Sequence, residues 1–560
     1  MYAAAALVCS LALLAAGSVE AQITKLPGAA EPGRPETKPP SLPAAPVELR
    51  WIIKLPPGPE PPKNLRDETL ELEDLILEGV TAYKRAELLD LFEHHLGKTI
   101  TFAQFYAISR AIQSRYQKDG YILSFSYVPP QTVEFGVFKI AVVEGYIDRV
   151  VVEDLKGTLK RTIERTLAPL TRSRPLRSSD LERYLLLAND LAGVRLTGVL
   201  QPSKTTRGAT ELVAKATHKL FGGGASIDNR ASEFTGRWQA MADLSTSSLF
   251  GMGEWLAVNF SEANGFDELV SFGASYSQPM GSEGLRADSA IGYSVAHPGF
   301  TLDSFDVRTE SLTVDLDISS PLIRSRAQTL NLAAGFTVRD TEVELLDAKF
   351  SRDRLRLLRA HVGYNHAGIL GGTSGIALDV SQGVPIFGAS DPDDDTTSRA
   401  DAQPTFTKAV LDVVHLQPIV DGLSLQIAAI GQYARAPLPA SEEFAVGGSR
   451  FGRAYNSGEA TGEDGVAVSL ETGYDIRTGT PLIRQFRPYG FYDFGKAWDR
   501  KSSSSTGSHQ SVASAGIGLR TRFISGGTLR IEYGYPLTHQ PSNQSGDKHG
   551  RLFVFGGWRF

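Results

Sequence analysis

An arginine in a glycine-rich stretch and a carboxylate in an aromatic stretch have side chains that could form a specific charge pair. Residues 446–455 are Val-Gly-Gly-Ser-Arg-Phe-Gly-Arg-Ala-Tyr, which includes Arg453, and Asp493 lies within 489–495, Tyr-Gly-Phe-Tyr-Asp-Phe-Gly. A guanidinium offers a planar fork of N–H donors that a carboxylate accepts in pairs. On a strand, Asp493 shares a face with Gly495, which leaves room for an inserted arginine. Taken alone, the residue types favour two ordinary charges that line a polar channel.

No catalytic signature accompanies these residues. The sequence contains no His-Glu-x-x-His, no phosphate loop ending in Lys-Ser or Lys-Thr, and no Gly-x-Ser-x-Gly. Cys9 is the only cysteine and falls in an expected leader, so the mature chain has no cysteine for thiol chemistry or metal binding. Residues 391–395 carry Asp at alternate positions but lack the glycine that a calcium loop needs next. We therefore expect no enzyme, no metal and no cofactor.

The first 66 residues predict export followed by a tether. In residues 1–21 an apolar run precedes Ser-Val-Glu-Ala, which predicts a signal peptide cleaved after Ala21. Prolines crowd residues 22–66 and predict an extended linker. Beyond the signal peptide the sequence has no run of about 18 or more apolar residues, so it predicts no transmembrane helix. A net charge of −6 over 560 residues gives no reason to expect nucleic acid as a partner.

Residues 67–145 and 146–218 each predict a small module with the element order β-α-α-β-β. In the first module, apolar residues at helical spacing over 88–96 predict one helix, and Thr101 with Gln104 has the capping-box spacing that starts another. The second module repeats the pattern with a helix striped by apolar residues and a second capping box. Its marker residues are Leu159, Ile163, Leu167, Ser179 and Glu182.

From residue 219 to 560 the pattern changes to strict alternation. In residues 312–318, Leu-Thr-Val-Asp-Leu-Asp-Ile, every second side chain is apolar and aspartates stand between them. This is the pattern of strands with lipid on one face and water on the other, whereas a β-sandwich would need a second sheet. A secreted chain that enters a membrane without helices must close its sheet. At about 20 residues per strand, the region predicts a transmembrane β-barrel of about 16 antiparallel strands.

The last ten residues predict a strand that ends on an aromatic residue. Phe560 is the final residue, and Trp558 shares its face. A terminal aromatic on an alternating strand resembles the signal by which outer-membrane proteins reach the barrel-assembly machinery. The same residues also suit the aromatic girdle at a lipid–water interface.

Several of these stretches, in this order, resemble the outer-membrane transporters of two-partner secretion, within the Omp85 superfamily. The tandem modules resemble POTRA (polypeptide-transport-associated) domains, and further similar stretches are 116–121, 143–146, 189–193, 227–230 and 248–254. In that family an Arg-Gly-Tyr or Arg-Gly-Phe loop folds back into the barrel and pairs with an acidic residue of the wall. Here the match falls on residues 453–455, with Ala454 where the family has mostly glycine.

The resemblance implies a role for each part. Arg453 and Asp493 would form a conformational lock in the pore, carried by the loop residues Gly447, Gly448, Gly452 and Tyr455. The barrel would lie in the outer membrane, in contact with its lipid, with the POTRA domains in the periplasm. It would export a cognate large exoprotein, of adhesin or haemolysin type, and we expect it to act as a monomer.

Three alternatives remain at this stage. A barrel-assembly or insertion factor of the same superfamily usually has more than two POTRA domains. A passive porin has no use for soluble modules, and a secreted enzyme lacks any supporting motif. The modules themselves have sheet edges that can accept an extended strand of an unfolded client, although they would also serve simply to brace the barrel mouth.

Overall fold

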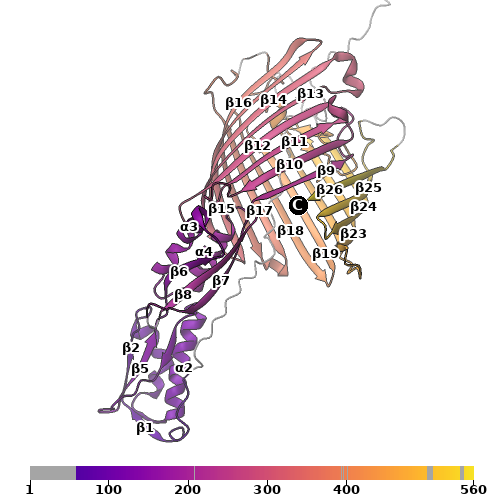
Figure 1. The fold of residues 1–560 in the computed structure, drawn as a ribbon. Coiled ribbons are helices and arrows are strands. Elements are labelled where there is room, and N and C mark those ends of the chain that lie inside the picture. The colour runs from indigo at the N-terminus through magenta and orange to yellow at the C-terminus, as the bar shows by residue number, and fades with distance from the viewer. Residues whose placement is uncertain are drawn as a thin grey trace, which may run out of the picture.

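The computed structural model describes residues 59–206, 209–391, 394, 396–399, 401–500, 509–542 and 548–560. The expected signal peptide (1–21) and residues 22–58 of the expected linker lie outside this part of the chain, as do Pro392, Asp393 and Asp395 of the acidic segment. Figure 1 shows a large barrel from one end of which two small modules extend in line.

The first module packs one long helix against a small sheet. Helix α2 (Phe102–Lys118) is preceded by Thr101, whose hydroxyl accepts from the Gln104 N–H at 3.2 Å. The Gln104 side chain accepts in turn from the Thr101 N–H at 2.9 Å, which confirms the first capping box. The sheet has the order β2-β5-β4, with strands β2 (Asp74–Glu78), β5 (Val137–Val143) and β4 (Phe125–Tyr127).

The helix predicted over 88–96 is wrong. The segment forms three short 3-10 turns, Arg85–Glu87, Leu89–Leu91 and Glu93–His95. An unpredicted strand, β3 (Lys98–Thr101), follows and pairs with β1 (Thr69–Leu72). Leu88 and Phe92 are fully buried, because successive turns bury residues four apart as well as a helix does. Residues 98–101 are extended because they pair with β1, and this tertiary contact overrides the helical spacing of the apolar residues before them.

The second module has the predicted β-α-α-β-β order. Its elements are β6 (Ile147–Glu153), α3 (Gly157–Leu167), α4 (Ser178–Asn189), β7 (Val194–Pro202) and β8 (Thr210–His218), with sheet order β6-β8-β7. The capping box predicted from Ser179 and Glu182 is wrong, because α4 begins two residues earlier than an N-cap at Ser179 requires. Arg177 is the N-cap, and its backbone N–H donates to the Ser173 hydroxyl at 3.3 Å.

Sixteen antiparallel strands close into the barrel, which confirms the predicted architecture. They are β9 (Phe221–Asp228), β10 (Gln239–Ser247), β11 (Trp255–Ala263), β12 (Leu269–Met280), β13 (Leu285–Ala296), β14 (Val307–Arg324), β15 (Gln328–Leu345), β16 (Ala348–Ala367), β17 (Thr373–Gly383), β18 (Thr407–Val420), β19 (Leu423–Ala434), β22 (Asp464–Tyr474), β23 (Ile483–Trp498), β24 (His509–Phe523), β25 (Gly527–Pro536) and β26 (Arg551–Arg559).

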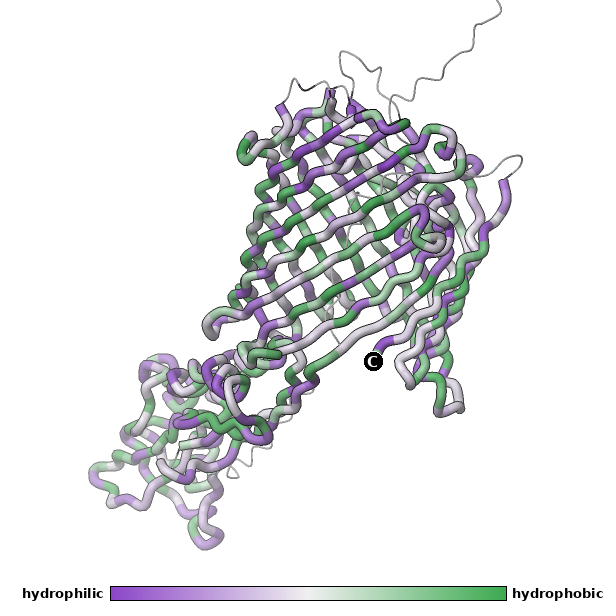
Figure 2. The backbone as a smooth tube through the Cα atoms, turned by 45° about the horizontal axis from the view of Figure 1, so that its top comes forward, coloured by the Kyte–Doolittle hydropathy of each residue, from purple (hydrophilic) through white to green (hydrophobic). Residues whose placement is uncertain are grey.

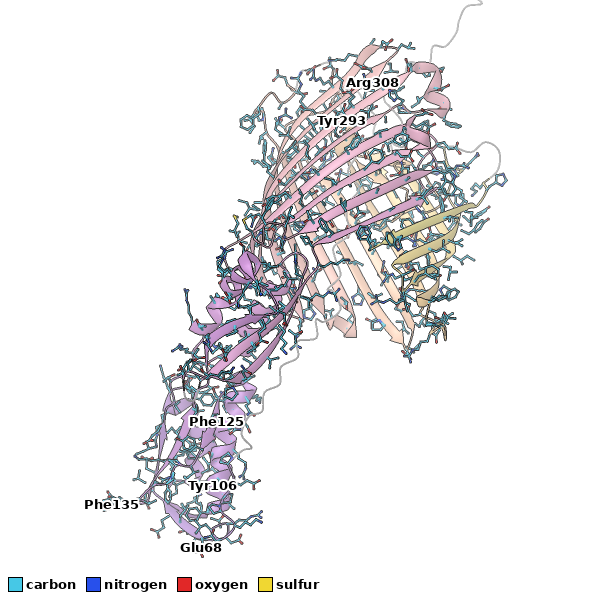
Figure 3. The ribbon with its side chains drawn as sticks, viewed as in Figure 1. Glu68, Tyr106, Phe125, Phe135, Tyr293 and Arg308 are labelled. Atoms are coloured by element: carbon cyan, nitrogen blue, oxygen red, sulfur yellow. The ribbon has the colours of Figure 1, made fainter. Side chains whose placement is uncertain are left out.

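Apolar and polar residues alternate along the barrel strands, as the colours in Figure 2 show, and many of the large apolar side chains of these strands are exposed on the outer face of the wall. Leu316 and Ile318 are more than half exposed on the outside, and Tyr293 lies on the outer wall in Figure 3. Asp315, which directly precedes Leu316 and so has its side chain on the other face, accepts from the Thr337 hydroxyl of the neighbouring strand at 2.5 Å. Among the described residues, no helix is long and apolar enough to cross a membrane.

The barrel closes between its last strand, β26, and its first, β9. Their pairing runs from Phe555–Asp228 to Arg559–Gly224. Asn229 extends the seam, because its side chain accepts from the Val554 N–H at 2.7 Å and donates to the Leu552 carbonyl at 3.0 Å. The structure places Trp558 and Phe560 side by side on the outer face, with ring centroids 5.3 Å apart.

The second module is fastened to the barrel turns beneath it. Asp190, after α4, accepts from Arg324 at the end of β14 through two bonds of 2.8 Å. Thr162 of α3 donates to the Gly251 carbonyl in the β10–β11 turn at 2.9 Å. That turn is closed by Glu254, whose carboxylate accepts two backbone N–H groups of the turn. The module therefore has a fixed position at the barrel mouth.

Candidate functional site: an arginine-bearing loop inside the barrel

The segment between β19 and β22 contributes no strand to the wall. It forms a small hairpin of β20 (Phe444–Val446) and β21 (Ala460–Gly462), with residues 447–459 as its loop. Val446 and Tyr455 are fully buried in a cluster with side chains of the wall strands. The loop is thus packed against the inside of the barrel.

Three glycines give the loop its shape. Gly447, Gly448 and Gly452 all have φ between +78° and +113°, a region that other residues rarely adopt. At Gly447 a Cβ would lie 1.9 Å from the carbonyl oxygen of Asn456. Backbone bonds hold the tight form, from the Gly447 N–H to the Phe451 carbonyl and from the Tyr455 N–H to the Gly452 carbonyl.

The structure brings Arg453 and Asp493 together. The guanidinium donates from Nε to Oδ2 and from Nη2 to Oδ1, both at 3.0 Å, and the backbone N–H of Arg453 donates to Oδ2 at the same distance. Arg453 is 4 % exposed and Asp493 fully buried. The guanidinium also lies on the ring of Phe491, 3.7 Å from its centroid, where a cation is attracted to the aromatic face.

Further carboxylates and arginines complete the cluster. Glu471 accepts from Arg453 at 2.7 Å and from Arg520 at 2.5 and 2.9 Å. Glu532 accepts from Arg230 at 2.5 Å. Three guanidiniums thus balance three buried carboxylates, which is the condition under which charges are tolerated inside a protein. Sequence reasoning found one pair of this network, and its other members were hidden among the many charges of an alternating sequence.

Ala454 occupies the position where the family has mostly glycine, and the structure shows why alanine fits. Its φ is not in the left-handed region, so no glycine is needed for the backbone. Its side chain is fully buried against Gly534 of β25, where a Cβ would lie 3.2 Å from the Ala454 Cα. The space for the loop tip is provided by a glycine on the wall.

A second arginine of the loop, which sequence reasoning missed, holds the opposite side. Arg450 pairs through both Nη atoms with Asp412 of β18, where the Nη2–Oδ1 distance is 2.6 Å. Beyond the tip, the Tyr455 hydroxyl lies 2.8 Å from Thr538 Oγ1 and donates to the His539 carbonyl at 3.0 Å. The loop is therefore attached to β18 and to the β22–β25 wall at once.

These features define a class of protein: a sixteen-stranded membrane barrel preceded by tandem α+β modules and holding an arginine-bearing loop in its lumen. A family model described as "Haemolysin secretion/activation protein ShlB/FhaC/HecB" matches residues 209–521, and one described as "POTRA domain, ShlB-type" matches residues 70–145. The chain belongs to this family of outer-membrane transporters of secreted proteins, within the Omp85 superfamily. Its barrel lies in the outer membrane and its POTRA domains in the periplasm.

The relatives are distant but extend over most of the chain. The heme/hemopexin transporter protein HuxB of Haemophilus influenzae is 22% identical over 467 residues, which cover 83% of this chain and 82% of HuxB. The outer membrane transporter CdiB of Dickeya dadantii is 21% identical over 455 residues, or 80% and 79% of the two chains. The solved structure of CdiB from Escherichia coli has the same fold, with a TM-score of 0.74 at 20% identity over 90% of this chain and 93% of that one.

Proposed function

We propose that this protein exports one cognate large exoprotein, of adhesin or haemolysin type, from the periplasm to the cell surface. The observation that supports this most directly is the loop at 447–459, which occupies the lumen and is held there by the Arg453–Asp493 pair. In this proposal the pair acts as a conformational lock that positions the loop, and its rearrangement opens the path of the client.

The POTRA domains supply the capture step of this proposal. We assign them to residues 67–145 and 146–218, after a signal peptide and a linker, with the barrel at 219–560. The sheet of the first domain has β4 at one edge, and an edge strand offers unpaired N–H and C=O groups to an extended client. Because the second domain is fixed to the barrel by Asp190 and Arg324, a bound client would be delivered to one side of the mouth.

Quantitative proteomics of medium, cell surface and periplasm tests the proposal. Deletion of the gene should remove one large protein from the outside, with that protein degraded or retained in the periplasm. Restoring the gene with Arg453→Ala should give normal barrel levels but no export. Arg477→Ala is the matched control, because Arg477 is 89% exposed in a pair with Asp421, and it should restore export fully.

The same experiment distinguishes the main alternative. A broad fall in many outer-membrane barrels after deletion would contradict a dedicated exporter and favour an assembly or insertion factor. Export by the Arg453→Ala variant at wild-type rate would contradict the lock while leaving the exporter in place.

A further inference from the structure

A second buried charge cluster lies at the outer stem of the inserted loop. Glu442 precedes β20 and is 1% exposed, and it forms ion pairs with Arg339 of β15 and Lys408 of β18. The Lys408 ammonium lies 2.5 Å from Glu442 Oε2 and also donates to the Glu442 carbonyl at 3.0 Å. Gln432 of β19 donates to the same carbonyl at 3.1 Å.

This cluster holds a different part of the wall from the Arg453 cluster. Its partners in the wall are on β15, β18 and β19, whereas the wall carboxylates and arginine of the Arg453 cluster are on β22, β23, β24 and β25. In the strand register Lys408 of β18 lies opposite Ala434, the last residue of β19 before the stem. The Glu442 cluster therefore lies near the outer rim. Asp493 lies deeper, five residues before Trp498 at the outer end of β23.

Another arginine joins the two arms of the stem at the same level. Arg399, in the outer connection between β17 and β18, pairs with Glu443 at 3.1 Å and with Glu463 at 3.0 Å. Glu443 precedes β20 and Glu463 follows β21. The stem is therefore closed on itself and attached to the rim by charges that the loop tip does not share.

We propose that Glu442, Arg339 and Lys408 form an outer anchor that keeps the stem of the loop in place independently of the Arg453–Asp493 pair. These are positioning residues: they touch the stem and fix where it crosses the outer mouth. The inference rests on the proposed function only in that the loop is taken to restrict the pore. Release of the tip would then leave the stem across the exit, so opening the pore requires two separate steps.

Cysteine labelling in intact cells tests the proposal without any client. In a Cys9→Ser background, Ser441→Cys reports on the stem and Ser514→Cys on the wall beneath the tip. Both serines are buried, at 6% and 0% exposure, and a cysteine is nearly isosteric with serine. Because the Ser514 hydroxyl also donates to Asp493 at 3.3 Å, each rate is compared with that of the same cysteine in the otherwise unchanged chain. The rate of reaction with a small charged methanethiosulfonate reagent then measures how often each site is uncovered.

The variants are chosen to break one cluster at a time. Arg339→Met leaves Glu442 with Lys408 as its remaining ion-pair partner and should speed labelling at residue 441 by about 10-fold or more, since a buried charge that has lost part of its compensation favours the open form. Labelling at 514 should stay slow. Asp493→Asn should do the reverse, and Glu442→Gln serves as a second, isosteric test of the anchor.

Arg308→Met is the control, because Arg308 lies at the outer end of β14 (Figure 3) and its pair with Glu310 is exposed. Barrel folding is checked for each variant by the mobility of the unheated protein on a gel. If either variant uncovers both sites together, the two clusters form one cooperative lock and the proposal is wrong. No change at residue 441 in either folded anchor variant would also overturn it.

Discussion

Removing Arg453 from the loop tip should lower the free energy of unfolding, and removing the charge of its partner Asp493 as well should restore part of that loss. Arg453→Met removes the two side-chain bonds that neutralise Asp493, which then keeps only two serine hydroxyls and one backbone N–H. Glu471 is less affected because Arg520 still donates two bonds to it. The cost is therefore roughly that of one stranded buried carboxylate, about 3–5 kcal/mol.

Adding Asp493→Asn to Arg453→Met should restore part of this loss. The double variant no longer buries an unpaired charge, so its free energy of unfolding should exceed that of Arg453→Met alone by about 2 kcal/mol. Urea unfolding of the protein in lipid vesicles, followed by tryptophan fluorescence, measures Arg453→Met, Asp493→Asn and the double variant. The equivalent changes at Arg477 and Asp421, both 89% exposed, should stay within about 0.5 kcal/mol of the wild type.

The reasoning would be refuted by one clear result. If Asp493→Asn destabilises the Arg453→Met variant further, the buried carboxylate is not the source of the cost. Additive effects within about 0.5 kcal/mol would show that the two side chains act independently despite their bonds.

Three further predictions concern packing, the domain joint and pH. Gly534→Val should displace the tip and lower stability by about 1–3 kcal/mol by overpacking against Ala454, whereas Ala454→Gly should cost less, both measured by urea unfolding. Asp190→Asn should loosen the joint, and hydrogen exchange should then rise at Arg324 and its turn while the barrel strands stay protected. Although burial raises the pKa of Glu144, hydrogen bonds from two hydroxyls and two backbone N–H groups hold that pKa below its usual 4.5. The first POTRA domain should therefore keep this stabilisation above pH 4.5 and lose it as the pH falls through the lowered pKa, seen as faster exchange that Glu144→Gln makes pH-independent.

The barrel could be predicted from the sequence because its pattern is local. Each strand must alternate between lipid and water, so residues 312–318 alone show both the element and the orientation of its faces. The 3-10 turns over 85–95 could not be predicted, since Leu88 and Phe92 are spaced as in a helix and only the pairing of β1 with β3 decides the outcome. The capping box at Ser179 failed because α4 begins two residues earlier, with Arg177 as its N-cap.

The charge clusters were mostly hidden for a different reason. In an alternating strand a buried, paired charge has the same local pattern as a solvated lumen charge, which hides Arg339 and Asp412, and Glu442 lies in a connection that has no strand pattern at all. What distinguishes them is a partner more than 30 residues away in the chain, which the segment inserted into the barrel brings close. The pairing of Arg453 with Asp493 was expected only from the family resemblance, and spacing could not have selected Asp493 over other lumen carboxylates.

Ala454 shows how a departure from a family pattern can be explained by its surroundings. A glycine at a loop tip is needed either for a left-handed backbone or for a close approach to a neighbour. Ala454 does not have a left-handed backbone, so the first condition does not apply. The close approach does occur, but the residue without a side chain is Gly534 on the wall, so position 454 can be alanine. The small residue required by this contact is on the wall, so the relevant quantity is the combined volume of positions 454 and 534. The two positions should therefore be tested together: alanine at 534 should be tolerated once 454 is glycine, and a double variant less stable than Gly534→Ala alone would contradict this.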